Sequence, residues 1–75
     1  MGGRPDRRML EKRSFSLSGH RTSVALEPEF WDALIAIADH RRASLAALVV
    51  EIDAARLVDR PLASALRIYA LQRRR

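Results

Sequence analysis

The sequence predicts a mostly α-helical fold with a short N-terminal β-ribbon and an additional C-terminal helix. Polar and apolar residues alternate over Lys12–Leu17 and again over Arg21–Leu26, a pattern typical of half-buried strands. After Pro28 the apolar residues recur at helical spacing instead. We therefore expect two short strands at the start of the chain and helices in the rest.

The two strands flank a short break at Ser18–His20 that contains a glycine, so they are expected to form a hairpin. Successive side chains of a strand point to opposite faces. On the second strand this places three residues together on the face away from the apolar core: Arg21, Ser23 and Ala25.

Three helices are expected after the strands. Pro28 fits the first position of a helix, which should run to about Arg41. Ser44 is a suitable N-cap for a second helix, which should end near Ala55. Pro61 opens the third helix, and the chain closes on three arginines.

The length of 75 residues allows one domain, predicted over residues 11–75 behind a disordered basic arm at residues 1–10. A chain this short seldom builds a core worth more than ~3–5 kcal/mol alone. It contains no cysteine, and nothing around His20 and His40 resembles a metal-ligand set, so no disulfide, metal or cofactor is expected. Since 48% of the residues are hydrophobic, a homodimer is the expected source of added stability.

The charge distribution favours a polyanionic partner. The formal net charge is +5, and 13 of the 14 cationic side chains are arginines, which suit phosphates and guanine edges. The basic residues gather at the two ends of the chain, while residues 26–60 hold seven acidic and four basic side chains. We expect a cytoplasmic protein, because no segment approaches a membrane span or a signal-peptide core. An enzyme is not expected, because no nucleophile–base pair, glycine-rich phosphate loop or metal set is evident.

Several segments resemble one known family. The run RTSVALEPEFWDAL at residues 21–34 looks like the strand and first helix of Arc/MetJ-type repressors, and RASLAALVVEI at 42–52 looks like the start of their second helix. The segments GHRTS at 19–23 and LASALR at 62–67 resemble a small bacterial subfamily of ribbon-helix-helix proteins with an extra upstream strand and a third helix. The resemblance covers nearly all of the chain except the N-terminal arm.

Residues 62–67 also resemble the start of a repressor second helix, which leaves a rival assignment. The short connection between the first helix and Ser44 favours the helix that Ser44 begins.

The resemblance implies an intertwined homodimer in which the strands of two chains pair into one ribbon. In DNA-binding members the outward side chains of the ribbon read bases in the major groove, and the start of the second helix meets a phosphate. The implied base contacts are Arg21, Ser23 and Ala25. The candidate phosphate contacts are Lys12, Arg13, Arg42, Ser44 and Leu45. The implied dimer core consists of Val24, Leu26, Phe30, Leu34, Ile37, Leu48, Val49 and Ile52.

The upstream strand raises a geometric objection to this docking. If Lys12–Leu17 pairs beside Arg21–Leu26, the sheet of the dimer has four strands, which is too broad to lie flat in a major groove about 12 Å wide. Three alternatives stay open. The upstream strand peels away on DNA, or it follows the phosphates, or the protein does not read DNA with its ribbon.

The sequence therefore predicts a sequence-specific DNA-binding transcription regulator. Its expected partners are a second copy of itself, with a tetramer on DNA as a larger form, and double-stranded DNA. The alternative is a dimeric adaptor module that uses the same fold without specific DNA reading and holds a protein partner through the third helix. Ala25 motivates this alternative, because its methyl group cannot hydrogen-bond to a base edge.

Overall fold

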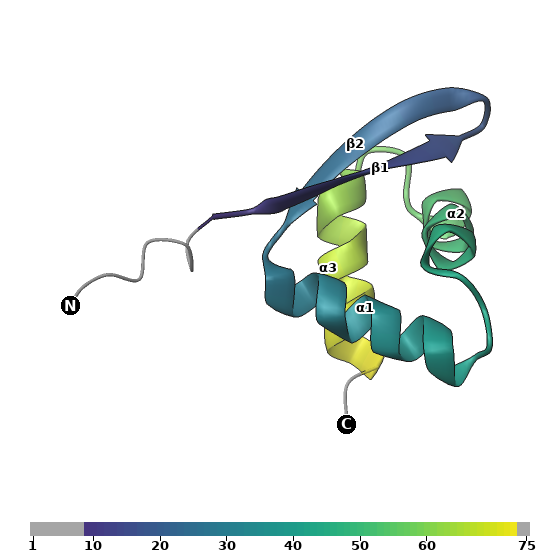
Figure 1. Cartoon of the computed structure of the whole chain (residues 1–75). Helices are drawn as coiled ribbons and strands as arrows, with labels where there is room; N and C mark the ends of the chain where they lie inside the picture. The colour runs from purple at the N-terminus through teal and green to yellow at the C-terminus, as the bar shows by residue number, and fades with distance from the viewer. Residues whose placement is uncertain (1–8, 74–75) are drawn as a thin grey trace.

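The computed structural model describes residues 9–73 and contains a two-stranded antiparallel sheet followed by three helices (Figure 1). The elements are β1 (Glu11–Leu17), β2 (His20–Leu26), α1 (Pro28–His40), α2 (Leu45–Ala55) and α3 (Leu62–Arg73). This arrangement confirms the predicted fold class, with strand and helix bounds within one residue or so of those expected. Most of the predicted N-terminal arm, residues 1–8, lies outside the described range.

The described residues, 9–73, contain neither a candidate membrane-spanning helix nor a metal-ligand cluster. No helix within residues 9–73 is long and apolar enough to cross a bilayer. Within the same range no three side chains of His, Asp or Glu lie close enough together to hold a metal ion.

The strands form one continuous hairpin. Its register runs from Leu17 opposite His20 at the turn to Glu11 opposite Leu26 at the open end. Both turn residues adopt positive φ, 53° at Ser18 and 81° at Gly19, which is typical of the two-residue turn that matches the twist of a hairpin. The glycine takes this conformation without steric cost. The upstream strand therefore does pair beside the second strand, which the sequence alone left open.

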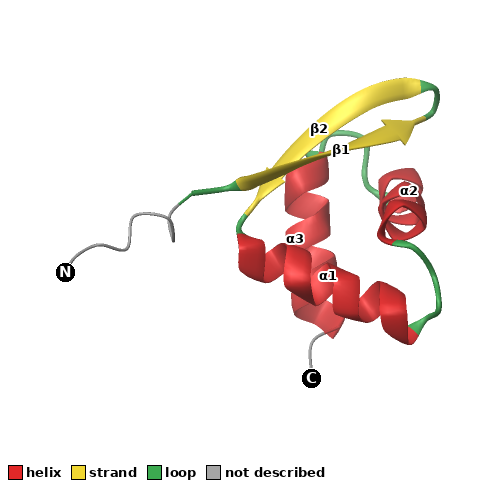
Figure 2. Cartoon of the chain, in the orientation of Figure 1, coloured by secondary structure: helices red, strands yellow, loops and turns green. Residues whose placement is uncertain are grey.

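The hairpin lies across the helices and closes the core with its inner face (Figure 2). Phe15 and Leu17 from β1 and Val24 and Leu26 from β2 are all buried. Beneath them Trp31 is fully buried, and its indole Nε1 donates a hydrogen bond of 2.7 Å to the backbone carbonyl of Glu11. The core therefore fastens β1 to α1 by packing and by a directed polar contact.

A single chain buries most of the residues that the sequence assigned to a core shared by two chains. Of these eight residues, six are buried in the structure: Val24, Leu26, Leu34, Leu48, Val49 and Ile52. Phe30 and Ile37 are partly buried at the edge of the same cluster. No second chain is needed to bury the six, and contact of any of the eight with a partner chain stays a prediction.

Helix α3 belongs to this core. It packs against α1, α2 and β2, and buries Ala65, Leu66 and Ala70. The Arg67 guanidinium donates to Glu27 at 2.9 Å, joining α3 to the residue that precedes α1. This hydrogen bond lowers the pKa of the Glu27 carboxyl below its usual value. Because α3 turns its buried face inward, that face is not available to a partner protein.

Candidate nucleic-acid interface

The side of the hairpin that points away from the core is a polar surface formed by three cross-strand pairs. We call this surface the outward face. The pairs are Lys12 with Ala25, Ser14 with Ser23, and Ser16 with Arg21. Five of the six side chains are exposed and Ala25 is half-buried. None of the six is acidic, so the two cations meet no opposing carboxylate on this face.

Two side-chain hydrogen bonds connect residues in the middle of the outward face. The hydroxyl oxygens of Ser14 and Ser23 lie 3.0 Å apart across the two strands. Beside them Nη1 of Arg21 donates to the Ser16 hydroxyl at 3.3 Å. Among the described residues, Arg21 makes no ion pair with a carboxylate. Its guanidinium therefore keeps most of its donors available on the solvent side.

All three predicted base-contact residues lie on the outward face. Arg21, Ser23 and Ala25 share one face of β2, as the alternation predicted. Lys12, a predicted phosphate contact, stands directly opposite Ala25 on β1. The structure thus brings four of the candidate residues onto one surface; their contacts with DNA stay predictions.

Arg13 lies elsewhere. It is opposite Val24, on the inner side of the hairpin, where its guanidinium pairs with Glu11 at 2.6 Å and lies 5.4 Å from the centre of the Trp31 ring. The structure therefore separates Arg13 from Lys12. The sequence could have predicted this placement. Arg13 is separated from Phe15 and Leu17 by an even number of positions, so all three lie on the same, inner face of the strand.

The second candidate location is the turn between α1 and α2. The amide of Ala43 donates to the Ala38 carbonyl at 2.9 Å and that of Arg42 to Asp39 at 3.0 Å. These two bonds close a Schellman motif, whose residue after the cap adopts the left-handed conformation. That residue is Arg42, with φ of 59°, at a position where glycine is favoured. Its side chain is exposed.

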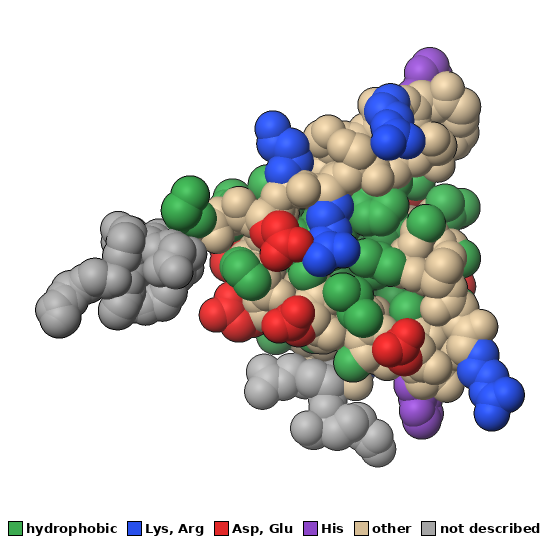
Figure 3. Space-filling model, viewed as in Figure 1, with side chains coloured by type: hydrophobic (Ala, Val, Ile, Leu, Met, Phe, Trp, Pro, Cys, Tyr) green, Lys and Arg blue, Asp and Glu red, His purple; other side chains and the backbone are tan. Residues whose placement is uncertain are grey.

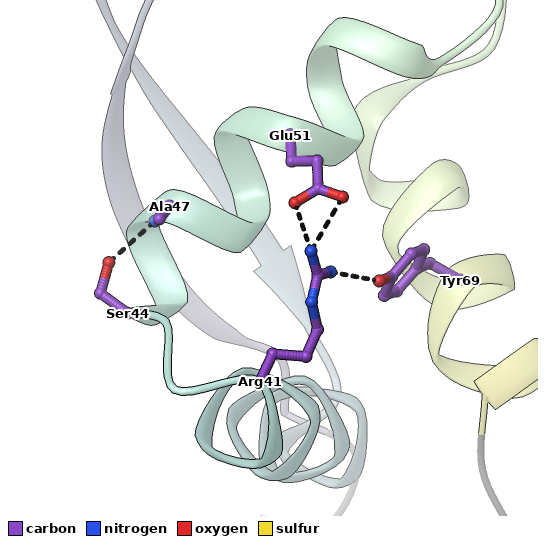
Figure 4. Close-up of polar contacts among 5 residues, drawn as sticks. All are labelled: Arg41, Ser44, Ala47, Glu51 and Tyr69. Carbon is purple, nitrogen blue, oxygen red and sulfur yellow. Dashed lines mark hydrogen bonds and ion pairs between the residues drawn. The ribbon is translucent and has the colours of Figure 1, made fainter.

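Ser44 caps α2 as predicted. Its side-chain oxygen accepts a hydrogen bond of 3.0 Å from the amide of Ala47 (Figure 4). Its carbonyl accepts one from the amide of Leu48. The first two amides of the helix, those of Leu45 and Ala46, precede these bonds and have no partner within the helix. Such amides at the positive end of a helix can bind an anion.

Arg41 ties the turn to the two following helices, a contact that sequence reasoning did not find. Its guanidinium contacts both carboxylate oxygens of Glu51 on α2, at 2.8 and 3.2 Å, and donates to the Tyr69 hydroxyl on α3 at 2.8 Å (Figure 4). The bonds to Glu51 raise the pKa of Arg41 above its usual value. No sequence spacing signals such a contact, because the three residues are far apart in the chain.

Positive and negative side chains are unevenly distributed over the visible surface. Figure 3 shows Lys and Arg side chains along the hairpin and at the lower right, while most acidic side chains lie below the hairpin over α1 and one lies against a basic side chain at the hairpin. Four described arginines are ion-paired, to Glu11, Glu51, Asp53 and Glu27. Lys12, Arg21 and Arg42 are outside these pairs, as are Arg60 and Arg73, whereas the candidate Arg13 is paired with Glu11.

A hairpin of this polarity above three short helices matches one protein family. The family model of the ribbon-helix-helix domain matches residues 10–73. The chain belongs to this family. Ribbon-helix-helix domains are generally DNA-binding transcription regulators, are typically not enzymes, and typically form homodimers. Searches of curated proteins and of solved structures found no significant match.

Arg42→Gly is expected to change stability and DNA binding of this ribbon-helix-helix domain in opposite directions. Glycine removes the cost of a left-handed arginine, so the free energy of unfolding should rise by about 0.5–1 kcal/mol. Loss of the cation should weaken binding to duplex DNA. Urea unfolding and fluorescence anisotropy measure the two effects. Arg42→Lys keeps both charge and backbone strain and is the control; equal DNA affinity of Arg42→Gly and the wild type would exclude a phosphate contact.

Proposed function

We propose that this chain is a sequence-specific regulator of transcription that binds double-stranded DNA as a homodimer, with its β-ribbon in the major groove. The observation that carries the proposal is the outward face of the hairpin. It is a strand surface without acidic groups, on which an arginine, a lysine and three serines stand at two-residue or cross-strand spacing. Strands of this kind fit the major groove and present side chains to base edges.

The three residues of β2 contribute different contacts. Arg21 is suited to bidentate hydrogen bonds with O6 and N7 of guanine, worth ~1–3 kcal/mol of discrimination. Ser23 can donate or accept and therefore discriminates little. Ala25 offers only a methyl group, which fits beside the methyl of a thymine. The proposed specificity accordingly depends mainly on Arg21.

Phosphate contacts fix the position of the protein on the duplex. We assign them to Lys12 on the outward face and to the start of α2, where Arg42, the Ser44 cap and the Leu45 amide lie together. Backbone amides and cations of this kind position a protein without reading sequence. Arg13 is not part of the proposed surface, since Glu11 and Trp31 hold it on the inner side.

The homodimer has two structural supports. Within residues 9–73 no strand pairs with the outer edge of β2, and a second β2 can complete it. In addition, α2 carries an exposed apolar stripe at four-residue spacing: Ala46, Val50 and Ala54. Val50 is 46% exposed although it is a large apolar side chain. Contact with a second copy would remove both the β2 edge and the apolar stripe of α2 from water.

Val50→Asp is expected to dissociate the dimer. A carboxylate on the apolar stripe would lie unpaired at the interface, which should raise the dimer Kd by more than about tenfold. Size-exclusion chromatography with light scattering over a dilution series measures this. Leu71→Asp makes the same chemical change at a 51%-exposed site on α3 and is the matched control. Unchanged dimerisation in Val50→Asp would place the interface away from the stripe.

The function itself is tested by titrating the protein against two labelled duplexes. One is the DNA upstream of its own gene and the other has random sequence, each measured by fluorescence anisotropy at several salt concentrations. Tighter binding to the upstream duplex, with log affinity falling linearly in log salt, is the expected result. Equal weak binding to both duplexes would reduce the proposal to non-specific electrostatics. Absence of binding at low salt would refute it and favour the adaptor alternative.

A further inference from the structure

We propose that β1 is a second DNA-contacting strand, which follows the sugar–phosphate backbone beside the groove and contacts phosphates through Lys12, Ser14 and Ser16. This proposal rests on the proposed function and adds two hydroxyl residues to its surface. It selects the alternative in which the upstream strand follows the phosphates, over detachment of that strand and over a ribbon that does not read DNA.

The first step is that β1 stays in the sheet when DNA binds. Its inner side chains, Phe15 and Leu17, are 7% and 6% exposed, so detachment would bring both into water. The indole of Trp31 also holds the backbone of Glu11 at 2.7 Å. A strand fixed by its side chains and its backbone does not peel away to let β2 into the groove.

The second step is the width of the paired sheet. In a homodimer joined at the outer edge of β2, the strand order is β1–β2–β2–β1, and neighbouring strands lie about 4.8 Å apart. The two outer strands are then about 14 Å apart, from three such spacings, whereas the major groove is about 12 Å wide. The two β2 strands fit between the phosphate rows, and each β1 comes to lie over a row.

The third step is the chemistry of the β1 residues on the outward face. Lys12, Ser14 and Ser16 are exposed and alternate along the strand, so all three point to the same side as Arg21 and Ser23. A lysine ammonium and serine hydroxyls donate hydrogen bonds to phosphate oxygens and carry no base preference. Each of the three also lies opposite a proposed base-contacting residue of β2. Every base-contacting residue therefore has a phosphate-contacting residue as its cross-strand neighbour.

A cysteine pair tests whether β1 stays in place. The Ser14 and Ser23 hydroxyls are 3.0 Å apart, and the chain has no cysteine of its own, so Ser14→Cys with Ser23→Cys forms the single disulfide available. The oxidised and reduced forms of this double variant are compared on the same duplex. We expect equal affinities, because the bond locks an arrangement that binding already uses. Loss of binding on oxidation, with recovery on reduction, would show that β1 must detach and would overturn the proposal.

A salt series tests what Lys12 contacts. For Lys12→Ala we expect the slope of log affinity against log salt to fall by about 1.8 per dimer, from about 0.9 for each phosphate contact. The ratio of affinities for the upstream and random duplexes should stay the same. Arg73→Ala removes an equal charge at the far end of α3 and should leave the slope unchanged (Figure 1).

Two outcomes of the salt series would refute the proposal, and the first would also remove Lys12 from the phosphate contacts, while both leave DNA binding and base reading through β2 intact. An unchanged slope in Lys12→Ala would place β1 away from the phosphates. A changed preference between the duplexes would make β1 a base-reading strand instead. If the wild-type protein itself binds no duplex, the proposed function fails, and the assignment of β1 fails with it.

Discussion

Arg21→Ala is expected to remove most of the discrimination between the upstream duplex and a random one. Each Arg21 that loses a bidentate contact with guanine costs ~1–3 kcal/mol, or roughly 5- to 150-fold in preference per copy. The effect is large because the neighbouring positions supply little: Ser23 is nearly indifferent to the base, and Ala25 has no hydrogen-bonding group. Anisotropy titrations of both duplexes at one salt concentration give the ratio directly.

Arg21→Lys is the control that separates charge from geometry. Lysine keeps the positive charge but lacks the planar fork that matches the guanine edge. We expect this variant to bind random DNA as tightly as the wild type and to lose much of its preference for the upstream duplex. If alanine and lysine both leave the preference intact, Arg21 does not read bases, and specificity must come from another part of the molecule.

Trp31→Ala is expected to have the largest effect on stability. The side chain is fully buried at the centre of the core, and such large-to-small changes cost about 3–5 kcal/mol. A chain this short seldom has more than ~3–5 kcal/mol of stability from its own core. We therefore expect a chain that is largely unfolded at 37 °C, measured by circular dichroism during urea and thermal unfolding. A midpoint equal to that of the wild type would contradict the central place of Trp31 in the core.

Trp31→Phe separates the packing of this residue from its hydrogen bond. Phenylalanine keeps an aromatic ring in the core but leaves the Glu11 carbonyl without its indole donor, which should cost about 1–3 kcal/mol. The variant should fold, with an intermediate urea midpoint. If it is as unstable as Trp31→Ala, the shape of the indole matters more than its hydrogen bond to β1.

Local patterns in the sequence were sufficient to predict the elements of this fold. Alternation gave both strands and the outward side of β2, and Pro28 and Ser44 marked the starts of α1 and α2 correctly. These signals work because side-chain periodicity and helix capping depend on neighbours in the chain. The grouping of Arg21, Ser23 and Ala25 on one face was predictable for the same reason.

The remaining features depend on contacts between distant residues. Sequence reasoning placed Arg13 with Lys12, because both are basic, although strand parity puts them on opposite faces. Helical spacing alone does not show that Trp31 lies at the centre of the core, because the inner face of β1 covers it and the Glu11 carbonyl accepts its hydrogen bond. The Arg41 contacts with Glu51 and Tyr69 join the turn after α1 to α2 and α3. Local periodicity in the sequence does not predict the angles at which these helices pack.

The core closed within one chain has a consequence for how such a regulator changes partners. Subunits whose cores interpenetrate can exchange only by unfolding, whereas a chain that buries Val24, Leu34 and Leu48 by itself is expected to stay folded on leaving the proposed dimer. At concentrations below the dimer Kd, the unfolding midpoint of such a chain should stop changing with dilution, whereas an obligate dimer keeps losing stability as it is diluted. Mixed dimers between related chains could form as quickly as subunits dissociate. The proportions of the different dimers could therefore follow changes in the synthesis of each chain without a refolding step.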